Sequence, residues 1–162
     1  PININGMTKT ISENLIRNFH SIHNTPYTIL RFPNCYSENY AKRGFSSLLK
    51  KAIRGEEIKI FGGNQILDLL HFNDAADAIL KSIYYDKAEI FNIGTGKPRK
   101  LISVINKLKR VLNKDIDYDF LPSHSFEVRA CKLNINKAKK HLKFEASIKL
   151  DDILRKMVSK WS

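Results

Sequence analysis

A single amide at the end of an expected strand is the side chain best suited to contact a ligand. Asn34 follows Pro33, directly after a segment rich in β-branched and aromatic residues. An amide both donates and accepts hydrogen bonds, so it can serve a sugar hydroxyl or a phosphate oxygen. Asparagine after proline is also common in turns that bind nothing. We therefore treat Asn34 as a candidate ligand contact with an ordinary turn residue as the alternative.

The acidic residues and the histidine nearby are better explained by folding than by catalysis. His71 is flanked by apolar neighbours, which favours a buried, hydrogen-bonded histidine over a catalytic or metal-binding one. Asp68 is expected to be a turn acid, and Asp74 is expected to cap a helix. No cluster of His, Cys and acids has the spacing of metal ligands, so we expect no metal site.

Two features of dinucleotide-dependent chemistry are absent from this sequence. None of the seven glycines forms a GxGxxG or GxxGxxG pattern, which would hold a pyrophosphate at a strand-to-helix turn. No Tyr-x-x-x-Lys occurs either, so the chain offers no tyrosine with a lysine one helical turn away.

Length and composition indicate one compact domain without a membrane span. The chain has 162 residues, 43% of them hydrophobic, and no apolar run long enough to cross a bilayer. Two cysteines without CxxC spacing, and no visible signal peptide, favour a reducing, cytoplasmic setting. Because the chain starts at Pro1 rather than Met, we expect it to derive from something longer.

The net charge of +12 admits an anionic partner. A non-enzymatic module that binds nucleic acid or another polyanion is one hypothesis. The lysines are not interleaved with aromatic residues, and no nucleic-acid-binding motif is present, so nucleic acid is not the favoured partner. A general bias toward Lys, Ile and Asn explains the charge more simply.

Helices and strands alternate along the chain, which is typical of an α/β fold. Apolar residues at helical spacing predict a helix over residues 8–22 with one buried stripe. The predicted strands are 27–32, 57–61, 90–93 and 116–120, and the further predicted helices are 46–54, 74–83, 101–112, 136–142 and 151–161. Gly55 stands where the second helix needs a left-handed residue after its end.

Five stretches together carry a resemblance to a known family. They are Asn5-Gly6-Met7-Thr8-Lys9 followed by Glu13, then Arg31-Phe32-Pro33-Asn34-Cys35-Tyr36, then Lys59 to Asp74, then Phe91-Asn92-Ile93-Gly94-Thr95-Gly96, and last Glu127 with Lys137-Ala138 and Leu142. In this order they resemble the second half of the extended short-chain dehydrogenases/reductases, the NAD-dependent nucleotide-sugar epimerases and dehydratases of the UDP-glucose 4-epimerase type. The resemblance covers nearly the whole chain.

The resemblance implies an α/β fold in two parts. Residues 1–34 would be a remnant of the NAD-binding Rossmann lobe, comprising the catalytic helix and the parallel strand after it. Residues 35–162 would mainly form the smaller α/β lobe that binds the nucleotide-sugar, with residues 90–96 returning toward the Rossmann lobe.

The implied catalytic and cofactor residues are incomplete. Asn5 occupies the position of the family's acid/base tyrosine, and an amide cannot exchange a proton with a sugar hydroxyl near neutral pH. Lys9 matches the family's lysine, which hydrogen-bonds the cofactor and lowers the tyrosine pKa, and a solvated helix lysine is the equal alternative. Pro33 is the second position that the resemblance assigns to NAD.

The implied phosphate clamp is also damaged. Leu67 stands where the family carries arginine, and His124 stands near where a second arginine is expected. Arg129 can compensate in part, although a plain surface residue is the simpler interpretation. The resemblance assigns substrate contacts to Asn34, Phe61, Arg129 and Glu127.

The sequence therefore predicts the C-terminal portion of an NAD-dependent nucleotide-sugar epimerase/dehydratase that is inactive as this chain. NAD and a nucleotide-sugar are the implied ligands, and a homodimer or a separate front half is the implied protein partner. The alternative function is a basic binding or scaffold module without catalysis.

Overall fold

The computed structural model describes residues 1–42, 44–123 and 128–162. Its helices are α1 (Ile4–His23), α2 (Gly44–Ile53), α3 (Phe72–Ile83), α4 (Leu101–Leu112), α5 (Asn136–Leu142) and α6 (Leu150–Trp161). Its strands are β1 (Thr28–Arg31), β2 (Asn34–Tyr36), β3 (Ile58–Phe61), β4 (Ile66–Leu67), β5 (Leu69–His71), β6 (Glu89–Asn92), β7 (Arg99–Lys100) and β8 (Tyr118–Leu121). Every helix and strand that the sequence predicts is present within a few residues of its expected bounds.

The strands pair across long stretches of sequence. In the described residues β1 pairs with β6, β2 with β5 and β3 with β8, all parallel, while β4 and β7 are antiparallel. Parallel pairs need crossover connections, which here contain helices. The α/β class expected from the alternation of elements is confirmed.

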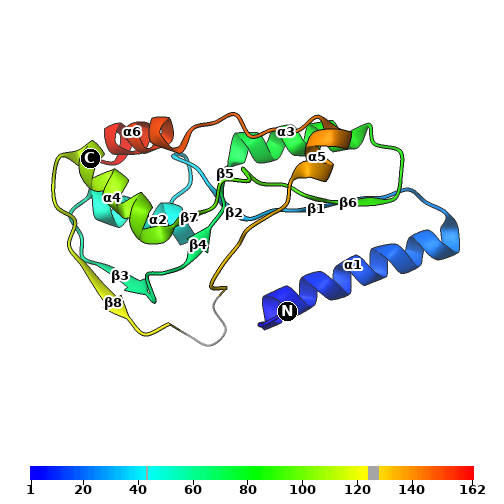
Figure 1. Cartoon of the computed structure of the whole chain (residues 1–162), viewed down its shortest axis with the longest axis horizontal. Coiled ribbons are helices and arrows are strands. Elements are labelled where there is room, and N and C mark those ends of the chain that lie inside the picture. The colour runs from blue at the N-terminus through cyan, green and yellow to red at the C-terminus, as the bar shows by residue number, and fades with distance from the viewer. Residues whose placement is uncertain (43, 124–127) are drawn as a thin grey trace.

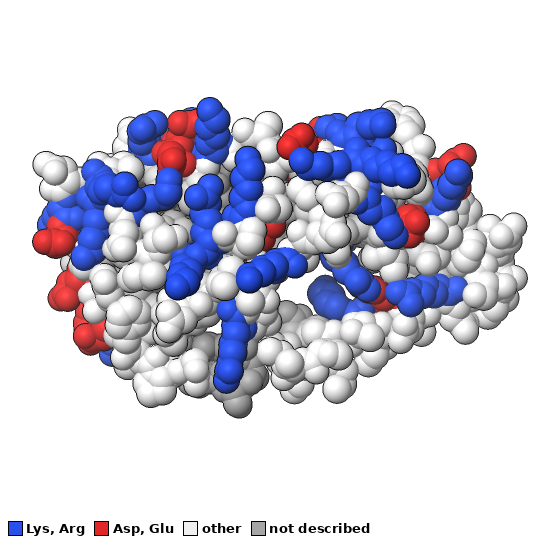
Figure 2. Space-filling model, viewed as in Figure 1, with Lys and Arg blue, Asp and Glu red and all other residues white. Residues whose placement is uncertain are grey.

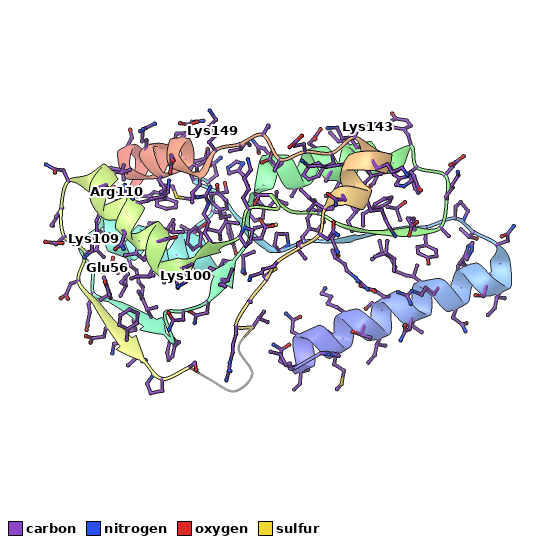
Figure 3. The ribbon with its side chains drawn as sticks, in the orientation of Figure 1. Glu56, Lys100, Lys109, Arg110, Lys143 and Lys149 are labelled. Carbon is purple, nitrogen blue, oxygen red and sulfur yellow. The ribbon has the colours of Figure 1, made fainter. Side chains whose placement is uncertain are left out.

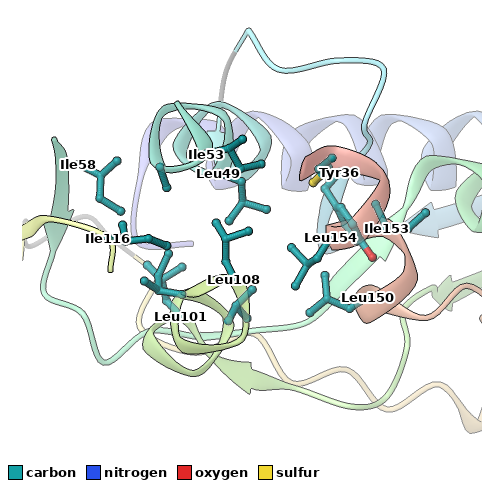
Figure 4. Packing of buried hydrophobic residues seen from close by; sticks show 14 of the residues in the cluster. Tyr36, Leu49, Ile53, Ile58, Leu101, Leu108, Ile116, Leu150, Ile153 and Leu154 are labelled. Atoms are coloured by element: carbon teal, nitrogen blue, oxygen red, sulfur yellow. The ribbon is translucent and has the colours of Figure 1, made fainter. Parts of the chain in front are cut away.

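Two hydrophobic clusters lie side by side along the molecule (Figure 1). The larger one packs α2, α4 and α6 together, with Leu49, Leu108 and Leu154 fully buried between them (Figure 4). The smaller one joins α3 and α5 to β6, around Phe91 and Phe144. Figure 1 shows α3 and α5 on one side of the β1–β6 pair and α1 on the other.

Helix α1 differs from its prediction in burial. Asn3 accepts a hydrogen bond from the Gly6 N–H at 2.8 Å, so the helix begins at Ile4, and Asn24 ends it in the left-handed conformation. None of its residues is buried, so the expectation of a buried stripe is wrong. The apolar residues of that stripe face solvent because no described segment packs over them.

Helix α3 begins earlier than expected and with a different cap. His71 is its N-cap, and its Nδ1 accepts a hydrogen bond from the Asn73 N–H at 3.2 Å. Asp74, expected to be the cap, lies in the first turn and is buried. Its carboxylate accepts hydrogen bonds from Ser147 and Ile148 instead. No helix among the described residues is long and apolar enough to span a membrane.

Candidate functional site

Three hollows in the surface share lining residues, and we call them together the groove. The first has a volume of about 290 Å³ and is lined by Gly62, Asn64, Gln65, Ser123 and Arg129. The second is lined by Asn34, Gly44, Phe45, Leu48, Gln65, Leu67, Leu101 and Val128. The third is lined by Pro1, Ile2, Asn3, Gly6, Val128, Arg129 and Ala130. Gln65 lines the first and second hollows, Arg129 the first and third, and Val128 the second and third.

A glycine turn forms one wall of the groove. Gly62 and Gly63 have φ angles of +69° and +74°, which other residues rarely adopt. A Cβ on Gly63 would also collide with the Phe120 ring. The turn brings Gln65 back onto the end of β3, where its Nε2 donates to the carbonyl of Phe61.

Gln65 carries a buried oxygen without a partner. Its Oε1 is buried and has no hydrogen-bond partner among the described residues. A buried acceptor that pairs with nothing costs free energy, so it favours a donor brought by a ligand. Sequence reasoning treated Gln65 only as part of a motif, and its place two residues after the glycine pair was the signal available.

Arg129 is held at the junction of two hollows by its backbone. Its carbonyl accepts a hydrogen bond from the Ile66 N–H at 3.0 Å, and the Cys131 N–H donates to the Ile66 carbonyl at 2.8 Å. Its guanidinium has no salt bridge among the described residues. The structure therefore places a planar cation in the groove that is unpaired as far as the described residues go, and it can bind a phosphate with two hydrogen bonds.

The other predicted substrate residues lie at strand ends around the groove. Asn34 opens β2, is exposed and lines the second hollow. Phe61 ends β3, one residue before the glycine turn. Leu67 also lines the second hollow, so a residue without charge stands there. Glu127 and His124 lie outside the described residues.

The predicted catalytic pair lies on α1. Asn5 and Lys9 are both exposed and are one helical turn apart, so they share a helix face. Neither lines the groove, although Asn3 and Gly6 beside them do. Pro33 is half-buried between β1 and β2.

The remaining polar candidates have structural partners. His71, 3% exposed, lies 2.9 Å through its Nε2 from a Glu38 carboxylate oxygen, as expected for a buried histidine. That hydrogen bond is the main cause that lowers the pKa of Glu38. Within the described residues no three His, Cys or acidic side chains converge to hold a metal ion.

Comparison with known proteins identifies the family. Residues 1–94 match the model of the NAD dependent epimerase/dehydratase family. That match spans more than half of the chain. The chain belongs to this family.

Individual relatives agree with the family assignment. A UDP-glucuronate 4-epimerase of Thermodesulfobacterium geofontis is 29% identical over all of this chain and 51% of its own length. The structure of a Thermotoga maritima UDP-glucose 4-epimerase with UDP-glucose is 28% identical, with a TM-score of 0.87 over 96% of this chain and 52% of that one. A Bacillus cereus UDP-glucuronic acid 4-epimerase, crystallised with UDP-glucuronic acid and NAD, has the same fold at a TM-score of 0.90 and 24% identity, over 99% of this chain and 53% of that one. The chain spans about half the length of the curated relatives it matches.

NAD is the cofactor that the epimerase/dehydratase family implies, and the described residues fit it only in part. Pro33 and Asn34 follow the carboxyl end of a parallel strand, where dinucleotides bind in doubly wound folds. Two strands lead directly into helices, β5 into α3 and β7 into α4, and neither junction contains glycine. The described residues therefore contain no glycine-rich turn for a pyrophosphate, and they do not form a complete NAD site.

Proposed function

We propose that this chain is the part of an NAD-dependent nucleotide-sugar epimerase or dehydratase that faces the substrate, and that it holds a nucleoside diphosphate sugar in the groove. The observation that carries the proposal is the groove itself. Asn34 and Arg129, from segments far apart in sequence, line two hollows that both contain Gln65 in their walls. Relatives that bind UDP-sugars share this fold.

Each groove residue has a distinct part in binding. Arg129 offers a bidentate cation to the diphosphate, and Asn34 offers an amide to the sugar or phosphate. The orphaned Oε1 of Gln65 accepts a hydrogen bond from the ligand. Phe61 ends β3 directly before the glycine turn, beside the groove, and we propose that its ring packs against the ligand. Glu127 completes the proposed set.

We further propose that the chain alone does not convert a nucleotide-sugar. NAD supplies hydride chemistry when bound, and the described residues contain no glycine-rich strand-to-helix turn that would hold its pyrophosphate. Proton transfer needs a group that titrates near neutral pH, and Asn5 has none. Lys9 lies on the same face of α1, but its ammonium has no tyrosine whose pKa it can lower. Binding and orientation are the functions left to these residues.

Calorimetric titration with UDP and UDP-glucose tests the binding proposal. We expect saturable binding that Arg129→Gln weakens about tenfold, as expected for loss of a charge-assisted bidentate contact. Arg155→Gln is the matched control because it removes the same charge from the exposed surface of α6. Equal affinity in the Arg129 variant, or no saturable binding at all, would refute the assignment of the groove.

A coupled epimerase assay with added NAD tests the second proposal. We expect no turnover of UDP-glucose, and we expect none after Asn5→Tyr, because a restored tyrosine still lacks a held cofactor. Measurable turnover by the unmodified chain would show that its residues hold NAD after all.

A further inference from the structure

A second cavity lies at the start of α6 and shares no lining residue with the groove. Its volume is about 350 Å³. It is lined by Leu69, Thr95, Lys97, Arg99, and residues 146 to 151. We call it the α6 cavity. In Figure 3 the labelled Lys149 marks the position just before α6.

Two buried carboxylates fix two walls of the α6 cavity. Asp68 is fully buried and accepts hydrogen bonds from the Thr95 N–H at 2.9 Å, the Thr95 hydroxyl at 2.6 Å and the Gly96 N–H at 3.1 Å. Asp74 is also buried and accepts from the Ser147 N–H at 3.1 Å and the Ile148 N–H at 3.2 Å. Both loops are therefore pinned from the protein interior, and the cavity is preformed.

The α6 cavity has an excess of unpaired positive charge. Lys97, Arg99 and Lys149 line it, and within the described residues none of their side chains makes a hydrogen bond or salt bridge. The wall also contains the Asp151 carboxylate, which is 2.6 Å from the Lys107 ammonium. That ion pair, together with the nearby charge of Arg99, holds the pKa of Asp151 below its usual range. On the face of the molecule seen in Figure 2, Lys and Arg side chains are more abundant than Asp and Glu side chains.

The backbone at the start of α6 adds donors beside these cations. Lys149 caps α6 without a side-chain hydrogen bond, and its carbonyl accepts from the N–H groups of Asp152 and Ile153 at 3.2 and 3.3 Å. The N–H groups of Leu150 and Asp151, which also line the cavity, have no acceptor among the described residues.

We propose that the α6 cavity binds the phosphate group of a small anionic ligand. The forked guanidinium of Arg99 can donate two hydrogen bonds to a phosphate. A phosphate also carries a double negative charge, which the three cations can neutralise. The volume is at the lower end of ligand pockets, which begin at roughly 300 Å³, so it holds a phosphate with a small organic group. The proposal is independent of the nucleotide-sugar groove.

Titration with inorganic phosphate and with glycerol phosphate, in a phosphate-free buffer, tests the α6 cavity. The two probes separate a site for free phosphate from one for a phosphate ester. We expect saturable binding of one equivalent, and we expect Arg99→Gln to weaken it about tenfold. Arg110→Gln is the matched control, because it removes the same charge at the far end of α4. Within the described residues the Arg99 side chain makes no hydrogen bond or salt bridge, so its variant should keep the fold.

Three results would overturn the proposal. They are the absence of saturable phosphate binding, equal affinity in the Arg99→Gln variant, and equal weakening by Arg110→Gln. Lys149→Gln gives a second readout and should also weaken binding. Arg129→Gln should leave phosphate binding unchanged, whereas it weakens UDP binding in the groove. This difference separates failure of the α6 cavity from failure of the groove.

Discussion

His71 illustrates how single residues in this chain are fixed by two partners at once. Its Nδ1 accepts a hydrogen bond from the Asn73 N–H, so the ring hydrogen is on Nε2 and points to Glu38. This arrangement of the ring satisfies both contacts. His71 therefore has a structural role, because it connects the start of α3 to the segment around Glu38.

Asp68 provides the sharpest test at the residue scale. Asp68→Asn turns one oxygen into an NH₂ group that faces a backbone N–H donor, which leaves a part-buried donor and the buried NH₂ group without acceptors. We expect a loss of about 2–3 kcal/mol in the free energy of unfolding, measured by urea denaturation. Asp119→Asn, on the exposed edge of β8, is the matched control and should cost less than about 0.5 kcal/mol. Equal stability of the two variants would show that the Thr95 turn does not depend on Asp68.

From the sequence, the residues that line the groove were easier to predict than the hydrogen-bond partners of individual side chains. Asn34 and Arg129 were marked by motif position, and the structure brings both to the groove. Asp74 was assigned to the wrong role, because an acid near a helix start looks like a cap whether or not the helix begins one turn earlier. The amide nitrogen of Gln65 donates to the Phe61 carbonyl, and the amide oxygen is left without a partner among the described residues. No pattern of residue types in the sequence reveals that contact.

At the scale of elements, α1 is attached to the rest of the chain by charge rather than by burial. Arg31 on β1 donates to both carboxylate oxygens of Glu13, at 2.7 and 2.5 Å. This hydrogen bond is the main cause that lowers the pKa of Glu13 and raises that of Arg31. Periodicity predicted the helix and its bounds, but burial depends on a packing partner that helical spacing cannot supply.

Arg31→Gln should therefore loosen α1 without unfolding the clusters. We expect faster hydrogen exchange in α1 and a loss of about 1 kcal/mol at most, since the arginine is half-exposed. Because the Glu13 pKa is lowered in the folded chain, its contribution is complete above the ordinary value of 4.5 and disappears as the pH falls through the lowered value. Protection of α1 in the unmodified chain should fall over that acidic range. An α1 that exchanges at the same rate in Arg31→Gln would exclude the ion pair as its anchor.

The whole molecule exposes apolar surface on both sides of the β1–β6 pair. On α1 the exposed residues include Leu15 and Ile22, at 66% and 68%, and on α3 they include Leu80 and Ile83, at 61% and 64%. Each of β1 and β6 is paired along only one edge in the described residues. Monomeric proteins rarely leave such patches and edges uncovered.

We therefore expect the 162-residue chain to self-associate at micromolar concentration, driven by the apolar face of α1. Sedimentation equilibrium measures this directly, and a Leu15→Glu, Ile22→Glu variant should shift the chain toward monomer because it places charges on that face. Lys149→Glu, which changes the charge far from α1, is the control and should leave association unchanged. If association instead uses the strand edges, the α1 variant will associate normally and amides of β1 will be protected in the oligomer. A monomer at high concentration, with β1 amides already protected, would show that the chain covers these surfaces itself and would contradict the prediction.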